Sequence, residues 1–243
     1  MPVEAAPSFL WVEEIPARGE RLVPGAEDAH YLTRVCRARA GEQVTLTDGR
    51  GTRARAVLID AGRRPVVEVL EVERLAASRS ALLLCGAPER GRADWMIEKV
   101  AELGVAALQP VHCERAAWPP AEVRVTRWHR LAVAALRQSR SCFLLDVRAP
   151  VPLAEAIGSL PAHAALYVAD PDGEAGAMVT PPSSGVAVGL VGPAPGLAES
   201  EVGWASAAGF LPICLSDNRL RSETAALAWS GWWACGSPGV GRK

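Results

Sequence analysis

The amino-acid sequence predicts an α/β protein in which a parallel-sheet domain follows a small β-rich domain. Three observations support this fold class. Residues 1–74 contain short alternating apolar runs separated by turn signals, which is typical of a small barrel or a sheet of hairpins. From residue 80 onward, apolar strand-like runs alternate with helical patterns, as in β-α-β units. Near the end of the chain, two loops follow two buried strand-like runs, and ligands of open parallel sheets bind at that edge.

The composition is that of an ordinary globular protein. The chain has 243 residues, of which 49% are apolar and 22% charged, enough for one large domain or two smaller ones. The net charge of −1 gives no global argument for nucleic acid. Charge is nevertheless uneven, because eight Arg stand against three acidic residues between positions 30 and 64.

Cysteine usage and hydropathy indicate the compartment. The six Cys show no C-x-x-C motif and no His at ligand spacing, so we expect reduced core thiols and no metal site. No basic, then apolar leader segment opens the sequence, and no apolar run reaches membrane-spanning length. These features predict a cytoplasmic protein without a membrane partner.

The first domain is expected to be built from hairpins. The runs QVTLTD, TRARAVLI and PVVEVLEVE are separated by DGRG and AGRRP turns, of which Asp48–Gly51 is the firmest hairpin signal. Just before it, Arg34, Arg37 and Arg39 lie around a predicted short helix and its exit. They form either a solvated charged face or a patch that binds phosphates.

The middle of the chain predicts a β-α-β unit followed by a second helix. A strand in ALLLCGAP precedes an amphipathic helix that ends at Gly104, and a strand in AALQPVHCERA follows. Residues 123–138 form the next helical stripe, and Trp128 on it is expected in the core rather than as a platform for bases. The acidic loop ADPDGE after residue 168 is expected to be a solvated turn rather than a metal loop.

The two late loops bear on ligand class. Glycines at 189, 192 and 196 do not give the G-x-G-x-x-G spacing, and Pro193 and Pro195 lack the N–H groups of a phosphate cradle, so a dinucleotide is disfavoured. The second loop ends directly before an apolar helical run. There Ser222 is a plausible N-cap, with Glu223 in the first turn.

The pairing of GLVGPAPGLAESEV with LSDNRLRSETAALA resembles the terminal motifs of the bacterial ribosomal RNA uridine-N3 methyltransferases of the SPOUT superfamily. That family shows a Gly-Pro-Glu-Gly-Gly loop and a Leu-Gly-x-x-x-Leu-Arg-Thr-Glu-Thr-Ala segment. The matching residues are Gly192, Pro193, Gly196, Leu215, Leu220, Arg221, Glu223, Thr224 and Ala225. The departures are Ala194 and Pro195 for Glu-Gly, Ser216 and Asp217 for Gly-Pro, and Ser222 for Thr.

Two further segments extend the resemblance over most of the chain. The N-terminal domain of the family carries a similar pattern of His, Val, Arg, Gly and Asp residues. In this sequence the matching residues are His30, Val35, Arg37, Gly41, Glu42, Val44, Asp48 and Gly49. The residues Arg137-Gln138-Ser139-Arg140 resemble the family's Glu-Gln-Ser-Gly-Arg element, which lies near its active site, with Arg137 in place of the acidic residue.

The resemblance implies a fold and an activity. It implies a PUA-like, RNA-binding barrel over residues 1–74 and a SPOUT methyltransferase domain with a trefoil knot over 75–243. The implied activity is S-adenosylmethionine-dependent methylation of N3 of a uridine in 16S ribosomal RNA, within an assembled 30S particle and by a homodimer. The implied cofactor-binding residues are Leu190, Gly192, Pro193, Gly196, Leu215, Ser216, Asn218, Leu220, Arg221 and Thr224. The implied RNA-binding residues are Arg34, Arg37, Arg39, Gln138 and Arg140.

Catalysis of this reaction asks little of the protein, because the donor is already activated. Uridine N3 must lose its proton, and a guanidinium near O2 or O4 would stabilise the uracil anion. Arg221 is the hypothesis for that role, and Glu223 is either the proton acceptor or a structural residue of the helix start.

Two other functions stay open. The departures in both loops fit an RNA-binding protein on the same fold that has lost or altered its activity. A methyltransferase of this fold acting on another RNA, or on a small molecule, is the third reading. The inactive RNA-binding protein would bind ribosomal RNA without binding the cofactor. For an enzyme that acts on another RNA or a small molecule, replacing Arg34 and Arg37 by Ala should leave turnover unchanged, whereas methylation of ribosomal RNA should weaken and lose part of its salt dependence.

Overall fold

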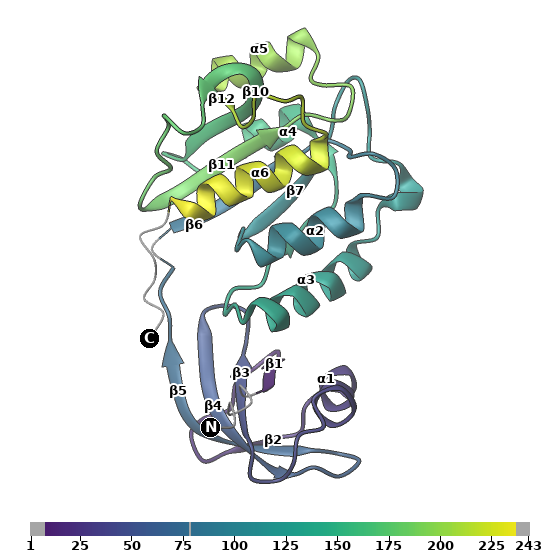
Figure 1. The fold of residues 1–243 in the computed structure, drawn as a ribbon, viewed down its shortest axis with the longest axis vertical. Coiled ribbons are helices and arrows are strands. Elements are labelled where there is room, and N and C mark those ends of the chain that lie inside the picture. Colours follow the sequence, from purple (N-terminus) through teal and green to yellow (C-terminus); the bar gives the residue numbers. More distant parts are fainter. Residues whose placement is uncertain (1–7, 78, 237–243) are drawn as a thin grey trace. The chain divides into compact units, whose positions relative to one another are not determined.

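The computed structural model describes residues 8–77 and 79–236 (Figure 1). The chain forms two compact units, one of residues up to 77 together with 136–144, and one of 78–135 together with the rest of the chain from 145. Residues 1–7 and 237–243, which the two expected domains include, lie outside the described residues. The expectation that everything after residue 74 forms the second domain differs from this division, because residues 136–144 pack with the first unit.

The first unit contains a five-stranded sheet with a short helical segment. Its strands lie in the order β1-β3-β4-β5-β2. Strand β1 pairs with β3 in parallel, and the other neighbours are antiparallel. Within the described residues β1 and β2 stand at opposite edges, so the sheet is an open, curled half-barrel rather than a closed barrel (Figure 1). The elements are β1 (Ser8–Trp11), β2 (Arg21–Leu22), α1 (Ala26–His30), a π-helix (Tyr31–Val35), β3 (Gln43–Thr47), β4 (Thr52–Asp60) and β5 (Val66–Arg74).

The predicted hairpin at Asp48–Gly51 is confirmed between β3 and β4. The Asp48 carboxylate accepts hydrogen bonds from the backbone N–H groups of Arg50 at 2.7 Å and Thr52 at 3.0 Å. Gly49 and Gly51 adopt φ of 71° and 93°, a region that side chains disfavour. The turn therefore forms for the local reason that its sequence indicated.

Residues 136–144 join the first unit through backbone hydrogen bonds and a small apolar cluster. The Gly51 N–H donates to the Cys142 carbonyl at 2.9 Å, and the Leu144 N–H donates to the Gly49 carbonyl at 2.8 Å. Phe9, Leu136 and Cys142 are buried together. These contacts join positions far apart in the sequence, so local patterns carry no signal for them.

The second unit is built on a parallel sheet, as predicted. Its strands lie in the order β12-β10-β11-β6-β7-β8, and β9 also pairs with β7. The strands are β6 (Arg79–Cys85), β7 (Ala107–His112), β8 (Asp146–Val147), β9 (Val151–Pro152), β10 (Ala165–Ala175), β11 (Gly185–Val191) and β12 (Leu211–Cys214). The helices are α2 (Ala93–Glu102), a 3-10 turn (Pro120–Glu122), α3 (Val125–Ser139), α4 (Leu153–Gly158), α5 (Glu199–Ala208) and α6 (Ser222–Cys235). The last residues of α3, from Leu136, belong to the first unit.

Helices cover both faces of this sheet (Figure 1). Helices α4 and α5 bury one face, where Leu84 and Leu190 lie in the core. Helix α6 packs on the other face beside α2, with Trp229 directly against Gly189, where a Cβ atom would come within 2.3 Å of the indole. Trp128 is fully buried, edge-on to Trp118 with ring centroids 5.4 Å apart, which confirms its predicted core position. Among the described residues, no helix has the length and apolar character needed to span a membrane.

Candidate functional site

A cavity of about 990 Å³ lies in the second unit at the carboxyl ends of β10, β11 and β12. This is the edge of the sheet at which the sequence predicted a ligand. Its walls come from the end of β10, the loop after β11, helix α5 and the segment after β12. The lining residues are Val168–Pro171, Val191–Ala194, Gly196, Leu197, Val202, Ala205, Ser206, Phe210, Pro212, Cys214–Leu220, Ser222 and Ala225.

Glycine positions bring the loop after β11 close to the end of β6. A Cβ atom on Gly86 would lie 2.4 Å from the Pro193 nitrogen, so only glycine lets the two backbones pass this closely. The Ala194 N–H donates to the Ala87 carbonyl at 3.3 Å, and Gly196, with φ of 83°, closes the turn by donating to the Pro193 carbonyl at 2.8 Å. Ala194 and Pro195, which depart from the family's loop, are exposed within an intact turn.

Ser222 ties the start of α6 to the same loop. Its hydroxyl donates to the Gly192 carbonyl at 2.8 Å, and its side chain is buried. The prediction that Ser222 is the N-cap of this helix is wrong, because Arg221 is the N-cap and Ser222 is the first helical residue. The physical reason is that Ser222 already has helical geometry, and its hydroxyl satisfies a carbonyl 30 positions earlier in the chain rather than its own helix.

A second connection links the end of β7 to the cavity wall, and the sequence did not reveal it. The buried Glu201 carboxylate accepts hydrogen bonds from the backbone N–H groups of Glu114 and Ala198, both at 2.8 Å. The Ser200 hydroxyl donates to the Glu114 side chain at 2.8 Å. These bonds fix Glu114 against the first turn of α5.

The lining of the cavity is mostly apolar with an acidic excess. Its charged members are Asp170, Asp217 and Arg219. Asp170 opens a bulge in β10, since Ala169 and Glu174 both register with Ile213, and its carboxylate accepts the Asp172 N–H at 2.9 Å. The acidic loop is therefore a structured bulge at the cavity rather than a free turn. No group of three or more His, Cys, Asp or Glu gathers as metal ligands in the part of the chain that the structure describes.

The predicted cofactor-binding residues divide into two groups. Those that line the cavity are Gly192, Pro193, Gly196, Leu215, Ser216, Asn218 and Leu220. Leu190, Arg221 and Thr224 lie outside the lining, and Leu190 is fully buried in the core. Sequence reasoning missed the end of β10 and the wall of α5, although the rule that ligands bind at the carboxyl edge of a parallel sheet could have pointed to β10.

The two predicted catalytic residues have different surroundings. The guanidinium of Arg221 is exposed at the cavity's end of α6 and forms an ion pair with the Glu89 carboxylate, from the loop after β6. Glu223 is 4% exposed, lies outside the cavity lining, and leaves its Oε2 atom without a hydrogen-bond partner. Burial raises the pKa of the Cys85 thiol, and the charges of Cys113 and Glu223 add to the rise.

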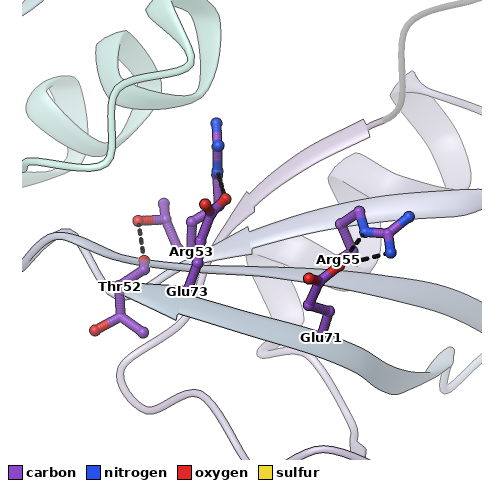
Figure 2. A network of polar contacts seen from close by, with 6 residues as sticks. Thr52, Arg53, Arg55, Glu71 and Glu73 are labelled. Carbon is purple, nitrogen blue, oxygen red and sulfur yellow. Dashed lines mark hydrogen bonds and ion pairs between the residues drawn. The ribbon is translucent and has the colours of Figure 1, made fainter. Parts of the chain in front are cut away.

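All predicted RNA-binding residues lie in the first unit and are exposed: Arg34, Arg37, Arg39, Gln138 and Arg140. Two other Arg of the basic window are neutralised on the sheet, because Arg53 pairs with Glu73 at 2.5 Å and Arg55 with Glu71 at 2.6 Å (Figure 2). Arg34, Arg37, Arg39 and Arg140 form no ion pair with another described residue. Arg34, Arg37, Arg39 and Arg140 therefore differ from Arg53 and Arg55, whose charges are balanced by glutamates on the neighbouring strand.

An open parallel sheet with a largely apolar cavity at its carboxyl edge defines a class of α/β proteins that bind small ligands at that edge. Residues 77–234 match the family described as "RNA methyltransferase domain", and residues 23–70 match "RNA methyltransferase PUA domain". The chain belongs to this RNA methyltransferase family, with its parallel-sheet domain preceded by a PUA-like domain. The trefoil knot of the resemblance stays a prediction.

Individual relatives agree with that family. The chain is 29% identical to ribosomal RNA small subunit methyltransferase E of Synechocystis, over 93% of this chain and 78% of that protein. It is 29% identical to the protein of the same name from Mycobacterium bovis, over 90% of this chain and 87% of that protein. A crystal structure of ribosomal RNA small subunit methyltransferase E from Neisseria gonorrhoeae, bound to S-adenosyl methionine, is similar in fold. It superposes with a TM-score of 0.83 at 28% identity, over 93% of this chain and 95% of that protein.

Proposed function

We propose that the protein transfers a methyl group from S-adenosylmethionine to N3 of a uridine in 16S ribosomal RNA. The observation that carries the proposal is the cavity at the ends of β10, β11 and β12, formed by the same two loops that carry the resemblance. The relative from Neisseria gonorrhoeae binds this cofactor on the same fold. Acting on ribosomal RNA would place the protein in the cytoplasm with the small subunit as its partner.

The lining of the cavity fits this cofactor. Two carboxylates and one guanidinium give the lining a net negative charge, which suits a ligand that carries a sulfonium and an ammonium group. The apolar side chains offer an adenine-sized surface, including Val168, Phe210 and Leu215. A dinucleotide with its pyrophosphate would instead need N–H donors that Pro193 lacks.

The chemistry requires aligned reactants and an available nucleophile. The bound sulfonium supplies an activated methyl group. In the reaction the N3–carbon bond forms, the sulfur–carbon bond breaks, and the N3 proton passes to solvent or to a base. Arg221 would stabilise the uracil anion through its guanidinium, since it lies at the start of α6 next to Ser222 of the lining. The Watson–Crick edge must be free, so the uridine must be unpaired or splayed out.

RNA recognition is assigned to the first unit in this proposal. The unpaired arginines at 34, 37, 39 and 140 would contact phosphates, which position RNA without reading its sequence. A homodimer, expected from the resemblance, is checked by light scattering on the purified protein.

Calorimetry followed by methylation tests the proposal. S-adenosylmethionine and S-adenosylhomocysteine should bind the purified protein in the micromolar range. The protein should then methylate 30S particles that lack the mark, and nucleoside mass spectrometry of the digested RNA should show N3-methyluridine. Binding without methylation of the particles would indicate another substrate, and binding to rRNA without binding of either cofactor would indicate an inactive RNA-binding relative.

A further inference from the structure

Asp28 and Arg137 form a buried ion pair in the first unit. The Arg137 Nη2 atom lies 2.6 Å from the Asp28 Oδ1 atom, and their side chains are 12% and 9% exposed. No other ion pair among residues 8–77 and 79–236 is buried as deeply on both sides. Buried charges persist only when they are paired, so the two side chains depend on each other.

Arg137 also contacts the element that follows Asp28. Its guanidinium carbon lies 5.3 Å from the centroid of the Tyr31 ring, which is a cation–π distance. Tyr31 is the first residue of the π-helix Tyr31–Val35, which continues α1. One side chain therefore holds α1 and the π-helix at two points, which fixes the direction in which this short segment faces.

The segment needs such a restraint. A five-residue helix followed by a single π turn is unstable on its own. Two residues after its end, Arg37 has φ of 52°, a left-handed conformation that non-glycine residues rarely adopt. Arg34 on this segment and Arg37 just beyond it are both exposed, so the order of the segment decides where their charges point.

The same pair brings the segment to the end of α3. Arg137 is adjacent to Gln138 and three residues before Arg140. Burial raises the pKa of the Tyr31 hydroxyl, and the positive charges of Arg137 and Arg140 oppose that rise. An acidic residue at position 137, as in the related pattern, would repel Asp28 rather than bind it.

We propose that Arg137 is a positioning residue for RNA: its pair with Asp28 and its contact with Tyr31 hold Arg34 and Arg37 on one phosphate-binding surface with Arg140. This inference rests on the proposed function and assigns to Arg137 a role without contact to RNA. It predicts that the effect of Arg137 on RNA binding is exerted through Arg34 and Arg37.

The test uses the full-length protein and a labelled single-stranded fragment of 16S ribosomal RNA, with binding measured by fluorescence anisotropy over a range of salt. Arg137→Gln and Asp28→Asn should each weaken binding about tenfold, equivalent to about 1.4 kcal/mol. The dependence of log K on log salt should become shallower by roughly 1.4, as expected when two single-strand phosphate contacts are lost. Because removal of one buried partner can unfold the segment, the double variant Asp28→Asn/Arg137→Gln is measured too and should show the same loss of affinity.

The decisive measurement is the coupling. In an Arg34→Ala/Arg37→Ala background, Arg137→Gln should have almost no further effect on RNA affinity. Equal losses in both backgrounds would overturn the inference, because Arg137 would then act on RNA independently. Arg55→Gln, which breaks an exposed pair with Glu71 in the same unit (Figure 2), is the matched control and should leave RNA affinity unchanged.

Two further readouts separate this inference from the proposed function. Hydrogen exchange at residues 26–37 should rise in Arg137→Gln, whereas S-adenosylmethionine affinity, a property of the second unit, should not change. Unchanged exchange would overturn the positioning role. If the wild-type protein neither binds nor methylates RNA, the proposed function fails, while the exchange measurement still decides whether Arg137 orders the segment.

Discussion

The guanidinium of Arg221 forms an ion pair with the carboxylate of Glu89, 132 positions earlier in the chain. This pair joins the start of α6 to the loop after β6. The side chains are 59% and 45% exposed, so the pair contributes little to stability. Its importance lies in the electrostatic environment of the residue that we propose to stabilise the uracil anion.

Replacement of Arg221 tests that role directly. Arg221→Ala should lower single-turnover methylation of 30S particles roughly 10²-fold with cofactor saturating, as for the loss of one transition-state donor. Cofactor affinity, measured by calorimetry, should change little, because Arg221 lies outside the cavity lining. Full single-turnover activity in Arg221→Ala would show that another group stabilises the anion.

Glu89 should moderate the charge of Arg221. Glu89→Gln keeps the shape of the side chain and removes its charge, so the guanidinium should stabilise the uracil anion better and single-turnover methylation should become faster. Asp146→Asn, which breaks the exposed pair with Arg148 away from the cavity, is the control. A slower reaction in Glu89→Gln would mean that the pair holds Arg221 in its working position instead.

Glu223 is tested by its isosteric amide. Because its carboxylate is buried outside the cavity lining, Glu223→Gln should preserve most methylation and leave the dependence of the rate on pH unchanged. A large fall in rate together with a flattened pH profile would support the alternative, in which the first turn of α6 moves and Glu223 accepts the N3 proton. Single-turnover rates across the pH range decide between the two.

Gly86, directly after β6, should be indispensable because it passes close to Pro193 in the loop after β11. Gly86→Ala would place a methyl group against Pro193 backbone atoms, so it should destabilise the protein by about 1–3 kcal/mol and weaken cofactor binding. Gly203→Ala, in the exposed middle of α5 with open space around its Cβ position, should stabilise it by about 0.5–1 kcal/mol. Urea unfolding and calorimetry measure both effects, and wild-type behaviour of Gly86→Ala would contradict the packing described here.

Buried thiols should make stability fall in alkaline solution. Burial raises the pKa of Cys85 and Cys142, and it raises the pKa of Cys113 to about 12, with a contribution from Glu201. The unfolded thiols ionise near pH 8.5, so the unfolded state binds fewer protons above that pH and stability declines by up to about 1.4 kcal/mol per pH unit for each thiol. Below pH 8 this contribution is fully present.

Urea unfolding between pH 7.5 and 9.5 measures that slope. Cys113→Ala should reduce the slope of unfolding free energy against pH by the contribution of one thiol. Cys235→Ser, at an exposed position, should leave the slope unchanged. Stability that does not depend on pH over this range would show that the thiols ionise as readily in the folded protein as in the unfolded chain.

Local sequence patterns predicted many of the elements, and the family resemblance pointed to residues that line the cavity. The Asp48–Gly51 hairpin, the core position of Trp128 and the parallel sheet all follow from turn chemistry and periodicity. Seven of the expected cofactor-binding residues line the cavity, because they sit in the two loops that leave β11 and β12. The N-cap at Ser222 was assigned incorrectly, since its hydroxyl has a better partner in a distant loop.

By itself, the sequence determined the fold class, the two kinds of domain and the loops of the site, because these depend on residues close together in the chain. Only the tertiary structure decided that residues 136–144 pack with the first unit, that Arg221 pairs with Glu89 and Arg137 with Asp28, and that Glu223 is buried away from the cavity. Each of these depends on contacts between distant positions. Burial and charge pairing depend on which residues lie close in space, and local periodicity does not reveal this for residues far apart in the chain.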